Sequence, residues 1–495
     1  MNNKIDGFTL QEATIASVHK AMEDGKLTCR QLVEMYIERI DAYDQKGPAI
    51  NSVILVNPKA LEIADEMDKK FKESGFTGPL HGIPVLLKDN VDTGDMPTTA
   101  GSLSLEGVTP EDDAFITRKF KEAGALILAK VNLHEFAVWG ETVSSILGQS
   151  LNPYDLTRTP GGSSGGTGAA IAANFGLVGI GTDTINSIRS PASACNLVGF
   201  RPTVGLVSGD GIVPYSFTQD TAGPIARTVE DAAKVLDVIA GYDQADSATA
   251  WSMGRIPKSY TEYLKVDGLK GKRIGVLKSF FGKEQHHQEV NELVLNSLKE
   301  MEKQGATLVD IEENIDADDL IKNVSVHLHD LKTHLGVYLK NLGELSQVHS
   351  LEEVIASGKY HEGIEENIKY AQTLDVGTPE YNQRLVKRTT LQTKVMDLMA
   401  KLDLDAIAYP HQKRLVVPTG EPQADRNGVL GAVTGFPAFS LPAGFTKPKK
   451  TAPMGVPVGI EILGRQFDEP TLVEIAYGFE QATHYRKAPM STPDL

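Results

Sequence analysis

Cysteines, aromatic residues and long apolar runs are scarce in this chain of 495 residues. The two cysteines, Cys29 and Cys195, form neither a disulfide framework nor a C-x-x-C metal-binding pattern, so we expect two reduced, buried thiols. No segment approaches the roughly 18 apolar residues that a membrane span requires. The first residues also lack the apolar core of a secretory signal. These absences predict a cytoplasmic protein that does not associate with a membrane.

Acidic residues outnumber basic ones, which gives a formal net charge of −16. Because phosphate binding requires a basic surface, this balance argues against nucleic acid as a partner. Hydrophobic residues make up 41% of the chain and are accompanied by 46 glycines and 25 prolines, as in globular proteins with a large core. The function therefore has to be read from individual motifs.

Helical and strand patterns alternate along most of the chain, which predicts an α/β fold. Periodicity and capping residues, including a capping box at Thr28, predict helices within 8–45 and at 58–72, 114–125, 134–141, 168–175, 191–200, 228–241, 288–305 and 471–483. Apolar runs predict strands at 83–87, 126–133, 177–180, 272–280, 404–410, 437–445 and 457–464. Residues 315–400 are richer in charge and more purely helical, as expected for an insertion or cap over the sheet.

Three histidines of this helical region, His327, His329 and His334, lie close to Asp330 in the sequence. Such a group can bind a metal ion, but the H-E-x-x-H type of spacing that marks helical metal sites is absent. We therefore expect these residues to form a solvated helix face, without a metal ion.

A lysine directly follows one of the predicted strands. Ile83–Leu87 is a continuous apolar run, and Lys88 extends it, with Leu86, Lys88 and Asn90 on one face. Lysine is seldom fully buried without a partner. Its side chain either reaches the surface along its apolar stem or is desolvated, with a lowered pKa that makes it a neutral base.

The stretch 160–191, PGGSSGGTGAAIAANFGLVGIGTDTINSIRSP, combines serines with many glycines. Gly161–Gly165 fits the pattern G-x-S-x-G, but the strand that a nucleophile elbow needs does not precede it. A phosphate-binding loop would need Gly-Lys-Ser/Thr after the glycines, and a dinucleotide fold would need a strand before them. Two alternatives remain: a glycine-rich turn, or an enzyme loop that aims backbone N–H groups at a developing negative charge.

A serine nucleophile requires a base, a path for its proton and an oxyanion site. The segments around Lys88, Ser163 and Ser187 together contain all three. Lys88 would be the base, and a serine near 163 would relay the proton. Ser187 lies on a loop after a buried strand, where successive N–H groups can converge.

This combination resembles the amidase signature family. The matching motifs are GIPVLLKDN, TPGGSSGG, GTDTINSIRSPAS, GFRPTVGLVS, QDTAGPIARTVEDAA, TGFPAFSLPAGF and PVGIEILGRQFDEPTL. The resemblance covers nearly the whole chain and is weakest between about 285 and 400. It implies a single domain over 1–495, built on a mixed central sheet with helices on both faces. Residues 285–400 would be a divergent, mostly helical region on the substrate side.

The resemblance also implies roles for individual residues. Carried over by motif and by the 24-residue spacing of the serines, the family's Ser–cis-Ser–Lys triad makes Ser187 the nucleophile, Ser163 the bridging serine and Lys88 the general base. The peptide bond between Gly162 and Ser163 would be cis. The backbone N–H groups that hold the oxyanion would be those of Thr184, Ile185, Asn186 and Ser187. Supporting roles fall to Gly162, Ser164, Asp183 and Arg189, and Gln219 and Asp220 would lie near the substrate amide. No metal or organic cofactor is implied.

One departure concerns the residues before the nucleophile, where the family has Gly-Gly and this chain has Ile185-Asn186. The oxyanion donors are backbone N–H groups, which remain when the side chains change. Glycine is used where φ is positive, however, and Asn tolerates such a φ far better than Ile. We therefore expect either a negative φ at Ile185 or a reshaped loop, and an altered choice of substrate.

The implied activity is hydrolysis of a small-molecule carboxamide through an acyl-enzyme, with release of a carboxylate and ammonia or an amine, by a monomer or homodimer. One alternative is the amidase subunit of a glutamine-dependent tRNA amidotransferase, which would require partner subunits. Another is a binding protein that has kept the fold without catalysis. Such a protein would not react with a fluorophosphonate at Ser187.

Overall fold

The computed structural model describes residues 4–5 and 7–495. Its centre is an 11-stranded sheet with the strand order β12-β11-β13-β15-β14-β9-β10-β8-β4-β5-β3. Neighbouring strands are parallel within β12-β11-β13 and within β8-β4-β5 and antiparallel elsewhere. The α/β class and the mixed sheet that the sequence implies are therefore confirmed.

The strands of the large sheet are β3 (Val53–Val56), β4 (Pro84–Lys88), β5 (Leu126–Val131), β8 (Val178–Asp183), β9 (Val198–Arg201), β10 (Thr221–Ala226), β11 (Arg273–Leu277), β12 (Thr307–Ile311), β13 (Ala406–Pro410), β14 (Ala438–Phe445) and β15 (Pro457–Leu463). Two small ribbons pair β1 (Lys4–Ile5) with β2 (Phe8–Thr9), and β6 (Val143–Ser144) with β7 (Gly148–Gln149).

The α-helices are α1 (Ile15–Glu23), α2 (Cys29–Tyr43), α3 (Ala60–Ser74), α4 (Phe115–Glu122), α5 (Gly165–Ala172), α6 (Arg189–Ala194), α7 (Val229–Ile239), α8 (Gln288–Lys303), α9 (Ala317–Asp319), α10 (His327–Asn341), α11 (Leu351–Ser357), α12 (Glu365–Gln372), α13 (Pro379–Lys401), α14 (Val429–Thr434) and α15 (Glu469–Thr483). Within the described residues, no helix combines the length and the apolarity that a membrane span needs.

The capping box that the sequence predicts at Thr28 is confirmed. The Thr28 side chain accepts a hydrogen bond from the backbone N–H of Gln31, and the Gln31 side chain accepts one from the backbone N–H of Thr28 at 3.0 Å. Two of the free N–H groups at the start of α2 are thereby satisfied. Both cysteines are buried free thiols, as expected.

Two predicted helices are wrong. Residues 134–141 contain only a 3₁₀ turn at Glu135–Ala137, because Phe136 has a positive φ of 51° and cannot continue a helix. The helix predicted at 191–200 ends at Ala194, and the apolar run that follows it becomes strand β9. Strands β3, β10 and β12 of the large sheet are also absent from the predicted set. Each of these short segments acquires strand geometry only through pairing with neighbours that are distant in the sequence.

Helices flank the sheet on both faces. Helix α5 lies on the face of β8 where Gly179 leaves room for it, since a Cβ at Gly179 would lie 2.4 Å from Thr167 of α5. Helix α6 packs against α5 and continues this layer over β9, β14 and β15. Helix α7 packs on β8, β9 and β10, and together with α4 and α15 it covers the other face.

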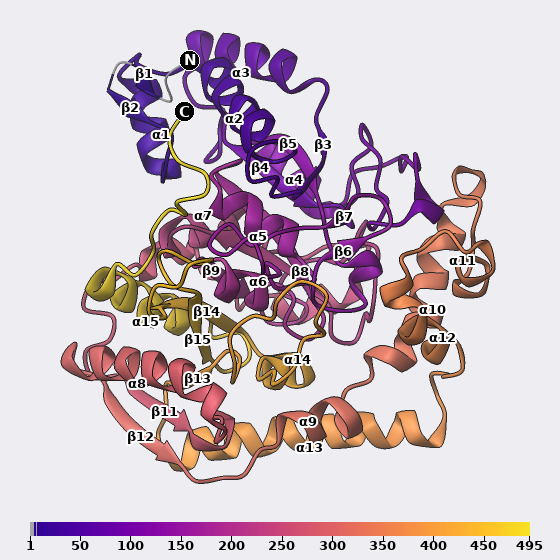
Figure 1. Ribbon diagram of the computed structural model, residues 1–495, viewed down its shortest axis with the longest axis vertical. Coiled ribbons are helices and arrows are strands. Elements are labelled where there is room, and N and C mark those ends of the chain that lie inside the picture. Colours follow the sequence, from indigo (N-terminus) through magenta and orange to yellow (C-terminus); the bar gives the residue numbers. More distant parts are fainter. Residues whose placement is uncertain (1–3, 6) are drawn as a thin grey trace.

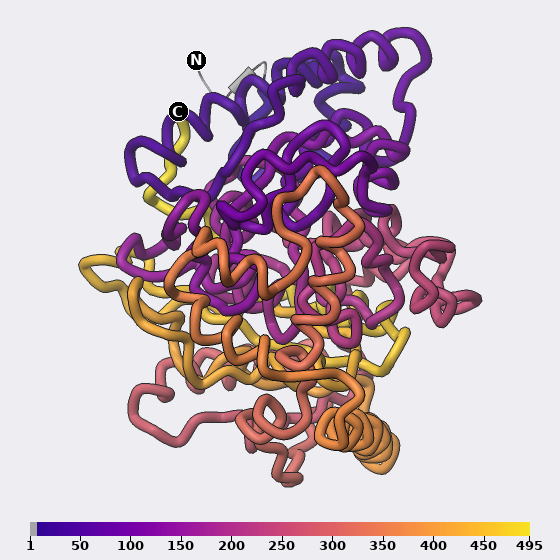
Figure 2. Tube along the Cα trace, turned by 90° about the vertical axis from the view of Figure 1, so that its right-hand side faces the viewer, coloured from indigo at the N-terminus to yellow at the C-terminus, as the bar shows by residue number. Residues whose placement is uncertain are grey.

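The helical region expected at about 315–400 consists of α9–α13. Figure 1 shows α10, α11 and α12 beside the sheet and α13 below it. Figure 2 looks at the molecule from that side, and the orange chain of this region lies in front of the central part. Leu331 and Leu335 of α10 share a buried apolar cluster with Phe136 and Tyr215, which belong to the loops at the end of the sheet.

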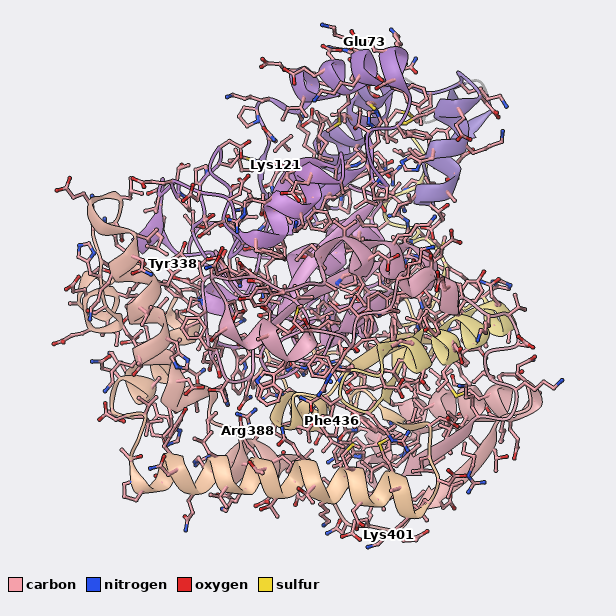
Figure 3. All side chains as sticks on the ribbon, turned by 180° about the vertical axis from the view of Figure 1, so that it is seen from behind. Glu73, Lys121, Tyr338, Arg388, Lys401 and Phe436 are labelled. Atoms are coloured by element: carbon pink, nitrogen blue, oxygen red, sulfur yellow. The ribbon has the colours of Figure 1, made fainter. Side chains whose placement is uncertain are left out.

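Arg388 of helix α13 contacts α14 and the loop before β10. Its guanidinium donates hydrogen bonds to the carbonyl oxygens of Val433 at 2.9 Å and Thr218 at 3.1 Å. Figure 3 shows Arg388 on the side of α13 that faces the rest of the molecule. The helical region therefore contacts α14 and the loop that precedes β10.

Candidate active site

Lys88, at the carboxyl end of β4, is completely buried. Its Nζ lies 2.8 Å from Ser163 Oγ and 2.8 Å from Thr182 Oγ1. Burial disfavours the ammonium and lowers the pKa of Lys88 to about 7, although Asp183 and Asp220 oppose this shift. Of the two interpretations of this lysine, the one in which the side chain reaches the surface is wrong, because the side chain is completely buried.

Ser163 is held by a tightly packed glycine segment. The peptide bond between Gly162 and Ser163 is cis, as expected. Gly161 has a positive φ of 73°, and a Cβ at Gly162 would lie 2.8 Å from backbone atoms of Gly140. Only glycine fits both positions. The Ser163 carbonyl accepts a hydrogen bond from the backbone N–H of His134 at 2.9 Å.

Ser187 lies in the loop between β8 and α6, directly next to this segment. Its carbonyl oxygen accepts a hydrogen bond from the backbone N–H of Ser164 at 3.2 Å, which joins the two loops. Its Oγ makes no hydrogen bond with any residue that the structure describes. Ser187 lines a cavity of about 90 Å³, so the hydroxyl is free to meet a ligand there.

The loop before Ser187 presents free backbone donors. Within residues 4–5 and 7–495, the N–H groups of Ile185, Asn186 and Ser187 donate to no protein acceptor. Neither Ile185 nor Asn186 has a positive φ, which agrees with the first of the two alternatives for this loop. Ile185 lines the cavity and joins a buried apolar cluster, so its side chain occupies space that glycine would leave open.

Asp183 fixes this loop through two buried arginines. Its carboxylate accepts hydrogen bonds from Arg189 at 3.1 and 3.2 Å, from Arg201 at 2.7 Å and from the backbone N–H of Ile188 at 3.0 Å. Burial alone would raise the pKa of Asp183, but the two guanidinium groups outweigh it and hold the pKa well below its usual range. Arg189 also donates to the Ile185 carbonyl at 2.6 Å and pairs with Glu461 of β15.

Ser164 contacts strand β8 through its hydroxyl. Its Oγ donates to the Thr182 carbonyl at 3.1 Å and accepts from the Thr182 N–H at 3.2 Å. Thr182, which no sequence motif singles out, therefore contacts Ser164 through its backbone and Lys88 through its side chain. Its position near the end of β8, which pairs with β4, is the only signal that could have found it.

Gln219 and Asp220 contact the loop that carries Ser187 from the side of the helical region. Thr184 Oγ1 donates to Asp220 at 2.6 Å, and Gln219 Nε2 donates to the Thr184 carbonyl at 3.2 Å. Gln219 is wholly buried, and its Oε1 accepts from Val326 N at 2.9 Å, so both ends of its amide have protein partners. Burial raises the pKa of Asp220 to about 6, against its hydrogen bonds.

Two cavities meet at this site. The cavity at Ser187 is lined by Ala137, Val138, Trp139, Thr184, Ile185, Asn186, Ser187, Tyr215, Ile321, His327, Leu328, Asn367 and Arg426. A larger cavity of about 470 Å³ shares Ala137, Thr184 and Tyr215 with it and reaches Asp220 and Tyr338 of α10. Since Ile321, His327 and Leu328 come from the helical region, that region builds one wall of the site.

The histidines of α10 do not form the solvated helix face that we expected. His327 and His329 are buried, and His334 is largely covered. Asp330 accepts hydrogen bonds from Ser216 at 2.6 Å and Tyr381 at 2.9 Å. The expectation failed because α10 packs its polar face against loop 213–217, which a helical periodicity in one segment cannot reveal.

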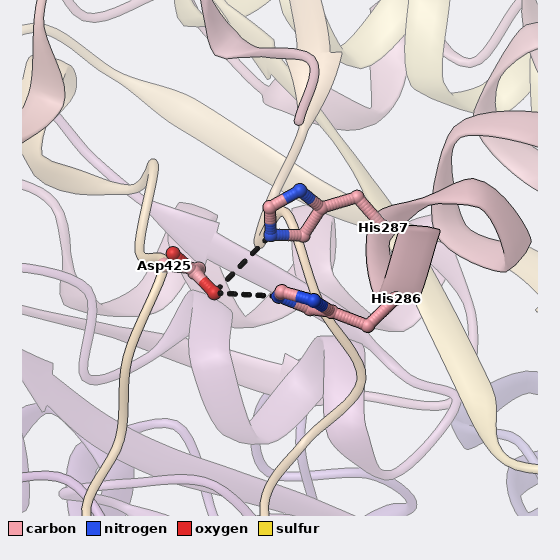
Figure 4. Close-up of side chains that lie close together, drawn as sticks. All are labelled: His286, His287 and Asp425. Atoms are coloured by element: carbon pink, nitrogen blue, oxygen red, sulfur yellow. Dashed lines mark hydrogen bonds and ion pairs between the residues drawn. The ribbon is translucent and has the colours of Figure 1, made fainter. Parts of the chain in front are cut away.

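The described residues contain one group that could hold a metal ion, namely His286, His287 and Asp425. The two Nε2 atoms lie 3.4 and 3.2 Å from the same Asp425 oxygen (Figure 4). His287 Nδ1 accepts a hydrogen bond from Glu284 N at 3.0 Å, which places the ring proton of the neutral tautomer on Nε2. His287 is thus arranged to donate to Asp425 rather than to bind a metal ion.

Known proteins resemble this chain over almost its whole length. A protein-family profile described as Amidase matches residues 31–473. A probable amidase of Arabidopsis thaliana is 36% identical over 97% of this chain and 92% of its own length. A glutamyl-tRNA(Gln) amidotransferase subunit of Thermoanaerobacter pseudethanolicus is 34% identical over 97% of this chain and 99% of its own length. The structure of native peptide amidase from Stenotrophomonas maltophilia, 36% identical, superposes with a TM-score of 0.87 over 97% of this chain and 98% of that one.

Proposed function

This chain belongs to the Amidase family, and on that premise we propose that it hydrolyses a carboxamide through an acyl-enzyme on Ser187. The observation that carries the proposal is the 2.8 Å contact between Lys88 Nζ and Ser163 Oγ in a fully buried site. A lysine with a pKa of about 7 is partly neutral at physiological pH. It can therefore act as a base, which an ordinary lysine cannot.

In the proposed mechanism, neutral Lys88 takes the proton of Ser163 Oγ, and Ser163 takes that of Ser187 Oγ as it attacks the amide carbon. The second transfer requires a hydrogen bond between the two serine hydroxyls, and in the structure Ser187 Oγ has no hydrogen-bond partner among the described residues. Both serines are joined through neighbouring backbone groups, and catalytic hydrogen bonds often tighten only when substrate binds.

The tetrahedral oxyanion is received by the backbone N–H groups of Thr184, Ile185, Asn186 and Ser187. Removing one donor from such a site costs about 10²–10³ in rate in other enzymes. The proton now on Lys88 returns through Ser163 to the leaving nitrogen, and the C–N bond breaks. Water then attacks the acyl-enzyme by the same route and releases the carboxylate and free Ser187.

The test is turnover on a panel of amides by the wild-type enzyme, Ser187→Ala, Ser163→Ala and Lys88→Ala, with Ser74→Ala as an exposed control on α3. We expect Ser74→Ala to keep full activity and the three site variants to lose at least about 10³-fold. Labelling with a fluorophosphonate should occur in the wild type and be lost in Ser187→Ala. Full turnover by Ser187→Ala on an amide that the wild type cleaves would disprove the assignment.

Relatives that are named as amidotransferase subunits define a second candidate function. A subunit of that kind would be expected to release ammonia from glutamine only with its partners. Assays of the chain alone, with glutamine and with simple amides, separate the two. We expect hydrolysis of simple amides without any partner, because the side chains of Ile185 and Asn186 already shape the cavity.

A further inference from the structure

Arg426 is a half-buried charged residue without an acidic partner at the edge of the active site. Its guanidinium carbon lies 4.6 Å from the centre of the Trp139 ring. The guanidinium forms no hydrogen bond or ion pair with any residue in the part of the chain that the structure describes. Arg426 lines the cavity that contains Ser187. Removing the charge of an arginine from water without such partners costs free energy. Arginines of this kind are common where a ligand supplies the missing hydrogen-bond acceptor.

Three carboxylates near Arg426, those of Asp425, Glu141 and Asp318, form no ion pair with it among the residues that the structure describes. Asp425 is held by His286 and His287, as Figure 4 shows. Glu141 attracts the guanidinium through space, but its carboxylate accepts the backbone N–H of Gln423 at 2.5 Å and forms no ion pair with Arg426. The protein therefore leaves the donors of Arg426 available.

The remaining walls of the cavity are poor in acceptors and rich in donors. No aspartate or glutamate is among the described residues that line it. Asn186 is 2% exposed, and its Nδ2 is a buried donor without a partner. His327 is neutral at physiological pH, because burial lowers its pKa to about 3. The permanent charge on the wall is thus positive, and in a cavity partly shielded from water it attracts an anion strongly.

We propose that Arg426, stacked on Trp139, binds a second carboxylate on the acyl part of the substrate. The enzyme would then prefer primary amides of dicarboxylic acids, such as succinamate and glutaramate, over neutral amides of the same length. This proposal rests on the proposed amidase function, since it assumes that Ser187 is acylated in the same cavity. The planar guanidinium fork matches a carboxylate in two hydrogen bonds, and Trp139 fixes its plane.

The experiment compares kcat/KM on succinamate and glutaramate with kcat/KM on butyramide and valeramide. The variant Arg426→Gln removes the positive charge. The variant Arg426→Lys keeps the positive charge but lacks the planar guanidinium that forms two parallel hydrogen bonds. Arg414→Gln is the control, because it removes a positive charge from the same loop outside this cavity. Arg426→Gln should lose about 10- to 100-fold on the carboxylate amides and less than about threefold on the neutral ones. Arg426→Lys should lie between, and Arg414→Gln should match the wild type.

Inhibition by the products gives a second readout, in which the amide that is hydrolysed carries no charge. Succinate or glutarate should inhibit hydrolysis of butyramide more strongly than butyrate does, and Arg426→Gln should abolish that difference. An equal loss by Arg426→Gln on charged and neutral amides would overturn the proposal, as would a wild-type preference for neutral amides. Either result would leave the amidase function intact, because that function is judged by Ser187→Ala on any amide that is cleaved.

Discussion

Replacing Lys88 by methionine should abolish catalysis and stabilise the protein at neutral pH. Lowering the pKa of Lys88 from 10.5 to about 7 corresponds to about 5 kcal/mol at 1.36 kcal/mol per pH unit. This is the free-energy cost of burying the ammonium. Methionine has a similar length and no charge. It would lose the two hydrogen bonds to Ser163 and Thr182, worth about 1 kcal/mol each, and the net gain should be about 2–3 kcal/mol.

The stability difference between Lys88→Met and the wild type should depend on pH. The cost is fully present below pH 7, where the folded protein must carry the buried ammonium, and it disappears as pH rises from about 7 to 10.5. The stability advantage of Lys88→Met should therefore be largest at or below pH 7 and should vanish or reverse near pH 10. Over the same lower range, wild-type kcat/KM on a neutral amide should rise about tenfold between pH 6 and pH 8, as neutral Lys88 accumulates.

Urea denaturation of the wild type and Lys88→Met at pH 6, 7, 8 and 10 measures the first effect. Lys130→Met is the matched control, because Lys130 is equally buried but lies 3.5 Å from the carboxylate of Asp89. Removing Lys130 leaves that carboxylate without its cation and should destabilise the protein by about 3–5 kcal/mol. If Lys88→Met is destabilised at every pH, or if the wild-type rate is flat between pH 6 and pH 8, the reasoning about a desolvated base is refuted.

Two further predictions concern the loop that carries Ser187. Asp183→Asn removes the partner of Arg189 and Arg201, so denaturant unfolding should show a loss of about 3–5 kcal/mol, and kcat should fall because the loop is no longer fixed; unchanged stability would contradict the role of this buried cluster. Ile185→Gly enlarges the cavity, so kcat/KM on amides with branched acyl groups should rise relative to straight-chain ones, while truncation of a buried side chain should cost about 2–5 kcal/mol of stability. A substrate preference identical to that of the wild type would show that Ile185 does not shape the acyl site.

Short-range information in the sequence was sufficient for several features. Thr28 and Gln31 form a capping box from residues three positions apart. The apolar run before Lys88 is a buried strand, and Gly161 and Gly162 occupy positions that exclude a side chain. These features depend on local sterics and on local hydrogen bonds. The motifs around Lys88, Ser163 and Ser187 predicted that these segments belong to one site.

Only the tertiary structure decided which distant residues meet there. Thr182 contacts Lys88 because β4 and β8 pair in register, and β9, β10 and β12 are strands only because neighbours complete their hydrogen bonds. The histidines of α10 are buried because a loop more than a hundred residues earlier packs on that helix. Arg426 lies over Trp139 and without an acidic partner because Asp425 is held by two histidines of another segment. The sequence thus determined the chemical groups of the site and their local conformation, while long-range packing determined their burial and partners, and with these the charge that each group carries.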